Sequence, residues 1–388
     1  MRVITECPEL KSLFIYLTHD CNQRCGHCWI NARPNGLHSN VMPSCTDYFR
    51  LIDSALPLGL KSLKLTGGEP LLSDKLEQVL EYSTGQNLSI AIETNAMLVD
   101  SRWIELFRRF AVEVSVSLDG ASPEVHDASR GVKGAFQLTW KAIEEMAGAH
   151  IPLVIICAVS RRNVAEIPKI LERLRSVGER GQLCLKINPI IPVGRAENLG
   201  PRGQILSPEE LLSLASYVTE ELVPVYTQHQ IGIALQLEMP FFDIRGLARG
   251  DGRIGASHCG FAQLLSVLAD GSISFCGVGY AEPGYTMGNI TEQYDLADIW
   301  HNHPVLKRAR MILQNGLEGV CRECLFQPVC RGGCRALALE CSKSLSAAPL
   351  WCQSLFDAGL FPKHLLRNWT EHGDARPEQE PARVLTSA

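Results

Sequence analysis

The sequence has no apolar run that approaches the ~20 residues needed to span a membrane. Its first residues, MRVITECPELK, lack the charged-then-apolar pattern of a signal peptide. There is no basic stripe, and the net charge of −5 gives no reason to expect nucleic-acid binding. These absences predict a cytoplasmic protein that binds neither nucleic acid nor a membrane.

What the sequence has in excess is cysteine, with 15 in 388 residues. Nothing directs the chain to an oxidising compartment, so disulfides are not expected and metal ligation is the better explanation. Most of the cysteines fall into recognisable groups. Those outside the groups are Cys7, Cys45, Cys157, Cys184 and Cys341. Of these, Cys157 lies inside the apolar run LVIICAVS and is expected to be a buried packing residue.

Short apolar segments alternate with amphipathic ones from Leu13 to about Pro192. The expected strands are Leu13–Leu17, Ser62–Leu65, Leu88–Ile92, Val112–Leu118, Leu153–Val159 and Leu183–Ile187. The expected helices are Thr46–Ala55, Lys75–Tyr82, Ser101–Phe110, Ala135–Ala147 and Val164–Val177, and later Pro208–Tyr226 and a Trp-containing helix near Leu296–Met311. This alternation predicts an α/β fold with a parallel sheet, a partial barrel whose ligands bind at the C-terminal ends of the strands.

Three cysteines follow the first expected strand on one loop: Cys21, Cys25 and Cys28, spaced C-x3-C-x2-C. Three thiolates can hold three irons of a cubane cluster and leave the fourth iron open for chemistry. Zinc sites more often use paired C-x2-C units, so a lone triplet fits zinc poorly.

This triplet resembles the loop of the radical S-adenosylmethionine (SAM) enzymes, whose open iron chelates the amino and carboxylate groups of SAM. The resemblance extends to about Cys352 and implies a partial (β/α)6 barrel of the radical SAM type with a small C-terminal iron–sulfur SPASM domain. The expected domains are the barrel (1–203), a bridging helical region (204–258), the SPASM domain (259–360) and a polar tail (361–388).

The segment TGGEP follows the second strand and contains Gly67, Gly68 and Glu69. Standing alone, it would read as a simple β–α turn. Here it resembles the radical SAM element that receives the SAM ammonium group, and paired glycines would let the backbone approach the ligand. Thr94 and Asn95, at the end of the third strand, are expected to line the same pocket.

The fourth strand leads into SLDG and then to RG. By resemblance, Ser117 contacts the SAM ribose or its surroundings and Arg130 pairs with the SAM carboxylate, since a guanidinium can donate two parallel hydrogen bonds. The alternative is that Asp119 and Arg130 tie the loop to the next helix. His27 occupies a position where an aromatic residue packs on the adenine, or else it is an exposed loop histidine.

Seven further cysteines resemble the SPASM domain in their order, which implies two auxiliary 4Fe–4S clusters beside the SAM-binding one. The resemblance assigns Cys259, Cys276 and Cys334 to the first auxiliary cluster, and assigns Cys321, Cys324, Cys330 and Cys352 to the second. Three ligands leave one iron open unless Cys341 or another cysteine completes the first cluster. A C-x2-C pair alone would also suit zinc.

The implied activity is reductive cleavage of SAM to a 5′-deoxyadenosyl radical that abstracts hydrogen from a substrate. The expected role is peptide maturation by a cross-link, thioether or similar modification. Tetrapyrrole side-chain chemistry is the alternative, and a non-enzymatic iron–sulfur electron carrier is the least favoured function. Sulfatase maturation is disfavoured because Gly277 follows Cys276 where that group carries an aspartate base.

The resemblance also implies partners for the enzyme. The expected substrate is a precursor peptide or protein, and the expected electron donor is of the flavodoxin or ferredoxin type. Only 20 residues precede Cys21, which leaves no room for an N-terminal leader-binding domain. Leader recognition would then need a separate protein or the surface of the barrel.

Overall fold

The fold is taken from a computed structural model that describes residues 7–32, 34, 42–178, 183–237, 260–280 and 282–367. The described strands are β1 (Ser12–Tyr16), β2 (Ser62–Thr66), β3 (Ser89–Thr94), β4 (Glu113–Ser117), β5 (Leu153–Val159), β6 (Leu183–Pro189), β7 (Ile231–Leu235), β8 (Leu264–Val267) and β9 (Ile273–Ser274). They form one sheet in the order β7-β6-β5-β4-β3-β2-β1-β8-β9, and only the β8–β9 pair is antiparallel.

The described helices follow the strands through the first half of the chain and dominate the second half. They are α1 (Cys45–Ala55), α2 (Leu76–Gly85), α3 (Ser101–Arg109), α4 (Pro123–Arg130), α5 (Ala135–Gly148), α6 (Ile167–Gly178), α7 (Pro208–Tyr217), α8 (Val223–Thr227), α10 (Leu296–Asn302), α11 (Pro304–Asn315), α12 (Val320–Glu323), α13 (Gln327–Cys330), α14 (Arg335–Ser342) and α15 (Leu350–Asp357). No helix of the described ranges is long and apolar enough to cross a bilayer.

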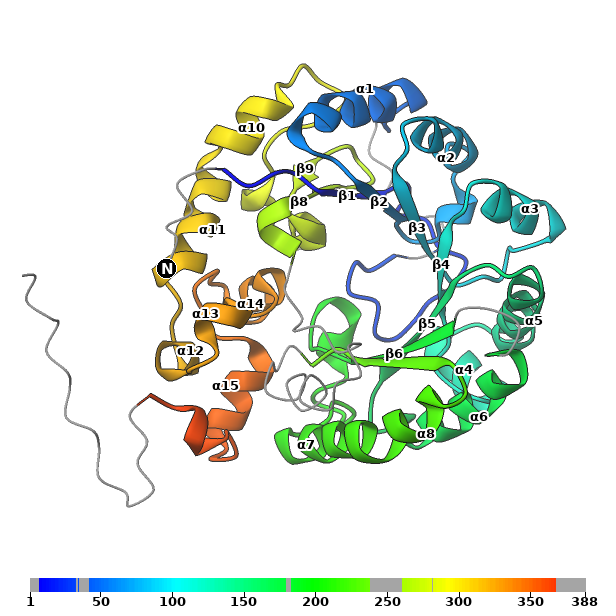
Figure 1. Ribbon diagram of the computed structural model, residues 1–388, viewed down its shortest axis with the longest axis vertical. Helices are drawn as coiled ribbons and strands as arrows, with labels where there is room; N and C mark the ends of the chain where they lie inside the picture. The colour runs from blue at the N-terminus through cyan, green and yellow to red at the C-terminus, as the bar shows by residue number, and fades with distance from the viewer. Residues whose placement is uncertain are drawn as a thin grey trace, which may run out of the picture.

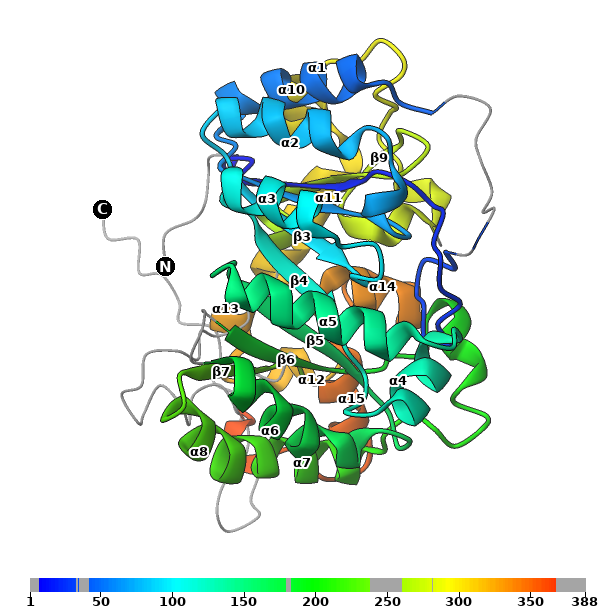
Figure 2. The same cartoon turned by 90° about the vertical axis from the view of Figure 1, so that its right-hand side faces the viewer.

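The sheet curves into an arc that does not close. Helices α1 to α8 lie along its outer side, and α13, α14 and α15 lie across its open side (Figure 1). A quarter-turn view shows the strands stacked between α1 and α2 at one end and α7 and α8 at the other (Figure 2). The predicted α/β class and the unclosed, mostly parallel sheet are confirmed.

Alternation of side chains along the strands separates a core face from a concave face. In β5 and β6, fully buried residues alternate with half-buried ones, as period-2 geometry requires. The fully buried set, which includes Ile155 and Leu185, belongs to one continuous apolar core. The half-buried set faces the inside of the arc, where a ligand can reach it.

The structure adds strands at both ends of the six predicted ones. The region 204–258 was expected to be a helical bridge, yet it also contributes β7, which pairs with β6. At the other end, β8 pairs in parallel with β1, so the C-terminal region extends the same sheet. The C-terminal region, with α13, α14 and α15, therefore lies across the open side of the arc.

Two predicted helices are interrupted. The predicted helix Pro208–Tyr226 consists of α7, a π-helical turn at Val218–Leu222, and α8. Pro224 lies in the first turn of α8 and has no backbone N–H to continue an α-helical ladder. The predicted helix near Leu296–Met311 ends at Asn302, and Pro304 then begins α11.

Candidate active site

The three cysteines of the first loop lie together beyond the C-terminal end of β1. Cys21 and Cys25 are buried, and Cys28 is half-buried. Burial, together with the neighbouring Glu69, Cys25 and Cys28, raises the pKa of Cys21 to about 12. Burial likewise raises the pKa of Cys25, so a metal that binds these two thiols would have to displace their protons.

A cluster fits this donor set better than a single ion. In the described ranges, no three histidine, cysteine or carboxylate side chains are grouped so that they could hold one metal ion. A cubane needs soft thiolate donors around a larger body than a single ion, and the three cysteines are donors of that kind.

The loop is held by segments on two sides. On one side, the N–H groups of Arg24 and Gly26 donate to the carbonyls of Arg130 and Ser129 at the end of α4. On the other side, the short 3-10 helix Gly194–Asn198 after β6 supplies Arg195. Both sets of contacts hold the loop through its backbone groups and do not use the cysteine side chains.

Arg195 was not predicted from the sequence. Its backbone N–H donates to the carbonyl of Cys28, its Nε donates to the carbonyl of Cys25 at 2.8 Å, and its Nη1 donates to the carbonyl of Ala32 at 2.8 Å. The preceding Gly194 has φ +60°, and a Cβ there would collide with the carbonyl of Trp29. The sequence signal for this contact was the Gly-Arg pair inside an irregular connection.

The glycines of TGGEP bring two loops together. The N–H of Gly68 donates to the carbonyl of Thr18 at 2.8 Å, and that of Glu69 donates to Asp20 at 2.8 Å. A Cβ at Gly67 or Gly68 would collide with the carbonyl of Thr18 or of Asp20. The glycines were predicted to make room for a ligand; in the structure they make room for the backbone that leads to the cysteine loop.

Glu69 is buried and held from several sides. Its carboxylate accepts hydrogen bonds from Thr94 Oγ1 at 2.7 Å, Asn95 N at 2.8 Å and Leu71 N at 3.1 Å. Burial raises the pKa of Glu69 to about 7, against the lowering effect of these donors. A carboxylate in this setting, close enough to Cys21 to raise the pKa of that thiol, suits a ligand that brings amino N–H donors.

Asn95 connects Glu69 to the cysteine loop. Its Nδ2 donates to Asn22 Oδ1 at 2.6 Å and lies 3.9 Å from the sulfur of Cys21. Thr94 and Asn95 thus lie where the sequence placed them, at the end of the third strand beside Glu69. Their described contacts position other groups, and contact with SAM stays a prediction.

Asp119 and Arg130 form a buried ion pair behind the loop. The Asp119 carboxylate accepts from Arg130 Nη2 at 2.7 Å, Ser129 Oγ at 2.6 Å and Ala158 N at 2.9 Å. Burial alone would raise the pKa of Asp119, but Arg130 holds it below its usual value. Arg130 Nη1 lies 3.8 Å from the sulfur of Cys25.

The tie between Asp119 and Arg130 was the alternative to a SAM carboxylate contact, and the structure contains it. Arg130 Nε is buried with no hydrogen-bond partner in the described part of the chain, so one donor is left over. Its pairing with the SAM carboxylate stays a prediction.

His27 and Ser117 lie near this ion pair. His27 Nε2 is 3.7 Å from Asp119 Oδ2, and Ser129 Oγ lies 3.5 Å from its Nδ1. Burial lowers the pKa of His27 to about 4, so the ring is neutral. Ser117 ends β4 on the concave face beside Ile156 of β5. A stacking role for His27 and a ribose contact for Ser117 are not tested by these positions.

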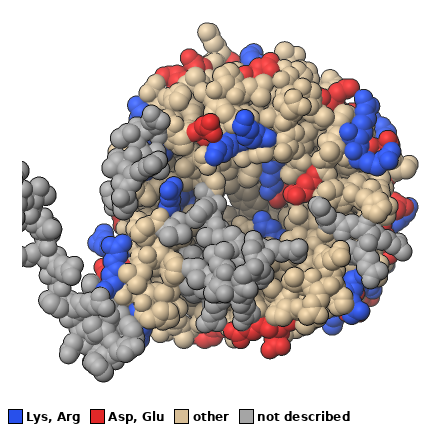
Figure 3. Space-filling model, in the orientation of Figure 1, with Lys and Arg blue, Asp and Glu red and all other residues tan. Residues whose placement is uncertain are grey.

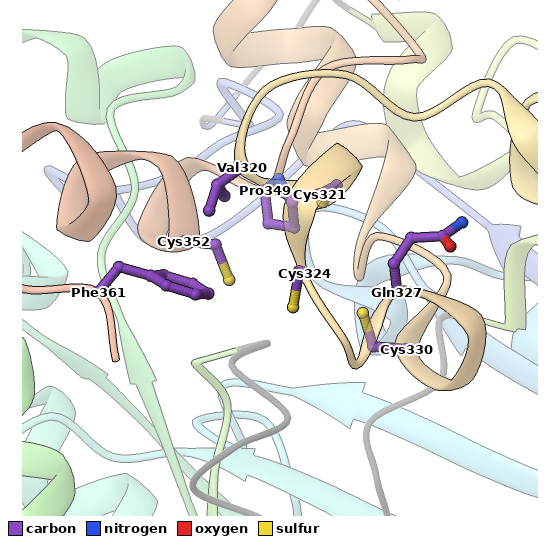
Figure 4. A pocket seen from close by; sticks show the side chains of 8 residues that line it. All are labelled: Val320, Cys321, Cys324, Gln327, Cys330, Pro349, Cys352 and Phe361. Atoms are coloured by element: carbon purple, nitrogen blue, oxygen red, sulfur yellow. The ribbon is translucent and has the colours of Figure 1, made fainter. Parts of the chain in front are cut away.

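Four C-terminal cysteines converge on one small pocket. They come from α12, α13, α15 and the turn after α12, and the lining residues are Val320, Cys321, Cys324, Gln327, Cys330, Pro349, Cys352 and Phe361 (Figure 4). The sulfurs of Cys324, Cys330 and Cys352 point into the same space. This is the set that the sequence assigned to the second auxiliary cluster.

The first auxiliary set is only partly described. Cys276 begins a 3-10 helix (Cys276–Tyr280) that packs on α14, and Cys334 is the N-cap of α14. Cys259 lies outside the described residues. Cys341 lies about 10 Å further along α14 at 1.5 Å rise per residue, beside Glu340, Lys343 and Glu197, which influence its pKa.

Gly277 packs directly under an aromatic ring. A Cβ at this position would lie 2.6 Å from Tyr16 Oη and 2.9 Å from Trp29 Cζ3, closer than real contacts allow. Tyr16 also meets Trp29 and Tyr280 edge to face, with centroids 6.3 and 5.4 Å apart. A side chain after Cys276 would require the ring of Trp29, from the SAM-cluster loop, to move.

Paired charges lie on the concave face of the sheet. Lys64 of β2 forms an ion pair with Glu93 of β3, and the two side chains are 25% and 31% exposed. Burial would raise the pKa of Glu93, but Lys64 and Lys186 hold it below its usual value. Figure 3 shows a hollow near the centre of the molecule, in the view of Figure 1, with basic and acidic side chains at its rim.

Comparison with known proteins agrees with this geometry. The chain matches the family model for the radical SAM superfamily over residues 15–174 and the iron–sulfur cluster-binding SPASM domain over residues 259–325. It is 31% identical over 352 residues to the AdoMet-dependent heme synthase of Methanosarcina barkeri, covering 87% of this chain and 94% of the relative. The chain belongs to the radical SAM superfamily. The radical SAM enzyme described here thus uses SAM and iron–sulfur clusters as cofactors.

Other relatives of this radical SAM enzyme have different names. It is 24% identical to the mycofactocin maturase MftC of Mycobacterium tuberculosis, covering 96% of this chain and 90% of the relative. Its fold matches Streptococcus suis SuiB bound to S-adenosylmethionine with a TM-score of 0.68 and 19% identity, covering 89% of this chain and 78% of that one. The SPASM match ends at residue 325, so Cys330, Cys334 and Cys352 lie beyond it.

Proposed function

We propose that this radical SAM enzyme modifies a peptide substrate, abstracting hydrogen and installing a cross-link, thioether or similar bond with the help of two auxiliary 4Fe–4S clusters. The observation that carries the proposal is the ion pair on the concave face of the sheet, in which Lys64 is already neutralised by Glu93. A paired charge suits the uncharged amide groups of a peptide better than it suits a carboxylate. A macrocycle with several acid groups would favour an apolar slot with cations left to bind them.

One relative in sequence and one neighbour in structure support a peptide substrate. MftC is named a maturase, and SuiB, whose complex with the precursor peptide SuiA has been solved, shares this fold with a TM-score of 0.67 and 18% identity, covering 89% of this chain and 76% of that one. Sulfatase maturation remains disfavoured, because Gly277 follows Cys276 where that group carries an aspartate base.

The residues of the site have separable roles. When bound, the reduced cluster and SAM supply a 5′-deoxyadenosyl radical that removes a hydrogen atom from the substrate. Cys21, Cys25 and Cys28 would hold that cluster, and Glu69 would accept N–H groups of the SAM amino end. Trp29 and Tyr16 pack edge to face between the cysteine loop and Gly277.

The proposal includes partners. An electron donor of the flavodoxin or ferredoxin type would approach the exposed part of the cysteine loop at Arg24 and Gly26. Leader recognition would come from a separate protein or from the barrel surface. The enzyme would work in the cytoplasm, where an iron–sulfur protein is kept reduced.

A second candidate is tetrapyrrole side-chain chemistry. It is favoured by one observation, the 31% identity to a heme synthase of which this chain covers 94%. The same hollow would then hold the macrocycle, whose acid groups would have to compete with Glu93 for Lys64. The two candidates share SAM cleavage and differ only in what is bound.

SAM cleavage is tested first. Anaerobically reconstituted enzyme with SAM and dithionite is expected to yield 5′-deoxyadenosine and methionine. The triple variant Cys21→Ala, Cys25→Ala and Cys28→Ala should lose this activity and keep its auxiliary iron. A reconstituted wild type that never cleaves SAM would contradict both candidates.

The substrate is tested next by mass spectrometry. Short open reading frames beside the gene supply candidate peptides, and a haem precursor with carboxylate side chains supplies the tetrapyrrole. A peptide that loses two hydrogens in step with 5′-deoxyadenosine supports the proposal. Loss of a carboxyl carbon from the tetrapyrrole, with every neighbouring peptide unchanged, favours the second candidate.

A further inference from the structure

Arg195 spans the backbone of the SAM-cluster loop. From one position after β6 it donates to three carbonyls, those of Cys25, Cys28 and Ala32. These three carbonyls bracket the last two cluster cysteines. The contact depends on Gly194, whose left-handed backbone lets the connection touch the loop.

The charge of Arg195 differs from that of Arg130. Arg130 is paired with Asp119 at 2.7 Å, so its charge is compensated. Within the described ranges, Arg195 has no carboxylate partner, because its guanidinium donates to carbonyl oxygens only. Its Nη2 is buried with no hydrogen-bond partner in those ranges. The side chain is nonetheless close enough to influence His27, between Cys25 and Cys28.

A cubane bound by three thiolates carries net negative charge, and one-electron reduction makes it more negative. An uncompensated cation near it stabilises the reduced state more than the oxidised one. We propose that Arg195 is a positioning residue that fixes the SAM-cluster loop and supplies the uncompensated positive charge that favours reduction of the cluster. The proposal holds whatever the substrate of the enzyme is.

Substitutions at Arg195 separate the charge from the contacts. Arg195→Met removes the charge and the side-chain hydrogen bonds. Arg195→Gln keeps a hydrogen-bond donor without charge, and Arg195→Lys keeps the charge without the two donors of the guanidinium. Arg202→Met is the matched control, because Arg202 is an exposed arginine in the same connection. Each holoenzyme is titrated with dithionite, and the cluster whose EPR spectrum changes on adding SAM is followed.

At the wild-type midpoint, Arg195→Met and Arg195→Gln are expected to lower the ratio of reduced to oxidised cluster about tenfold, as one charge at roughly 10 Å would do at an effective dielectric constant of about 20. Arg195→Lys and Arg202→Met should stay near the wild-type ratio. Hydrogen exchange over residues 21–32 should rise in all three Arg195 variants and not in Arg202→Met.

Three results would overturn the proposal. One is an unchanged ratio in Arg195→Met and Arg195→Gln. Another is an equal fall in Arg195→Lys, which would mean that the charge is not the cause. The third is unchanged exchange of the loop in every variant. If Arg195→Met fails to hold iron, the comparison of Arg195→Gln with Arg195→Lys decides the outcome by itself.

Discussion

At the scale of single residues, Glu69 is the group whose ionisation the site controls most directly. Burial raises its pKa to about 7, although Thr94, Asn95 and Leu71 donate to it. As pH rises through about 7 the carboxylate ionises and becomes a better acceptor for the SAM amino group. We therefore expect SAM affinity to rise with pH across this window. Glu69→Gln should flatten that rise and weaken binding by about 1.5–3 kcal/mol, or roughly 10- to 100-fold.

Equilibrium dialysis of labelled SAM at several pH values measures this effect. Glu77→Gln is the matched control, because Glu77 is a half-exposed glutamate of α2 paired with Arg102. A Glu69→Gln variant with the affinity and pH profile of Glu77→Gln would remove Glu69 from the SAM site. Native Glu69 stays protonated up to about pH 7 while the unfolded carboxyl ionises near 4.5, so the stability of the apoprotein falls as pH rises through this window.

Gly277 gives a second prediction at this scale. A methyl group there would meet Tyr16 Oη at 2.6 Å and the Trp29 ring, so Gly277→Ala should destabilise the region by about 1–3 kcal/mol through overpacking. Adding Trp29→Ala should recover part of that loss. Denaturant unfolding of the four proteins in a double-mutant cycle measures the coupling. Additive effects would mean that Trp29 does not occupy the space beside Gly277.

Residues that follow strands were predictable, and those in irregular connections were not. Glu69, Thr94 and Asn95 come together because parallel strands end at one edge, so their place in the sequence fixes their place in space. Arg195 lies in a connection without period, and nothing in its spacing indicates which loop it will reach. The role of the glycines at 67 and 68 was also missed in part, since their neighbours are backbone atoms of a distant segment.

At the scale of elements, one carboxylate joins three of them. Asp119, after β4, binds Arg130 and Ser129 of α4 and the N–H of Ala158 in β5. Asp119→Asn leaves the buried Arg130 charge without its partner and should cost about 3–5 kcal/mol. Denaturant unfolding followed by circular dichroism checks this. Asp74→Asn, at an exposed ion pair with Lys75, should cost less than about 1 kcal/mol.

The pH dependence of this contact has the opposite sign to that of Glu69. The pKa of Asp119 lies below its usual value despite burial, because Arg130 favours the ionised form. Its stabilising contribution is therefore complete above the unfolded pKa of about 4 and is lost as pH falls through the folded value. Equal stability of wild type and Asp119→Asn at neutral pH would contradict this account.

Apolar strands and long amphipathic helices were predictable as elements, because burial imposes a period on the sequence. The short helix α4, with the sequence PEVHDASR, was not predicted, since it buries only His126 and Arg130 and carries no apolar stripe. Tertiary contacts of those two residues stabilise it in place of a hydrophobic face. Likewise, Pro304 divides a segment whose apolar spacing alone suggested one helix.

At the scale of the whole molecule, the pairing of β8 with β1 could not be read from the sequence. Both strands are short and apolar, and Leu13 pairs with Leu265 across about 250 residues of chain. Local patterns fix which face of a strand is buried, while its neighbour is decided by register and by what else competes for the edge. The consequence is that the C-terminal cysteines are attached to the sheet that carries the SAM cluster.

The C-terminal region lies across the open side of that sheet, and its four-cysteine pocket joins α12, α13 and α15. These helices have 4, 4 and 8 residues, too few to be stable alone. A cluster bound by Cys321, Cys324, Cys330 and Cys352 would link them, so its loss should release the region. Cys352→Ser is therefore expected to lower iron content by about four atoms per chain and to raise proteolysis within 317–367.

Cys45→Ser is the matched control, because Cys45 is a half-buried cysteine of α1 outside every predicted cluster. Iron and sulfide assays with limited proteolysis under anaerobic conditions compare the two variants. Metal binding stabilises chiefly the segments that supply its ligands, so the SAM cluster should not depend on Cys352. Both variants should therefore still cleave SAM without substrate, at rates within about twofold of each other. Full iron content in Cys352→Ser would show that this cysteine is not a ligand. Loss of all iron would show that the two regions fold as one unit, contrary to the prediction.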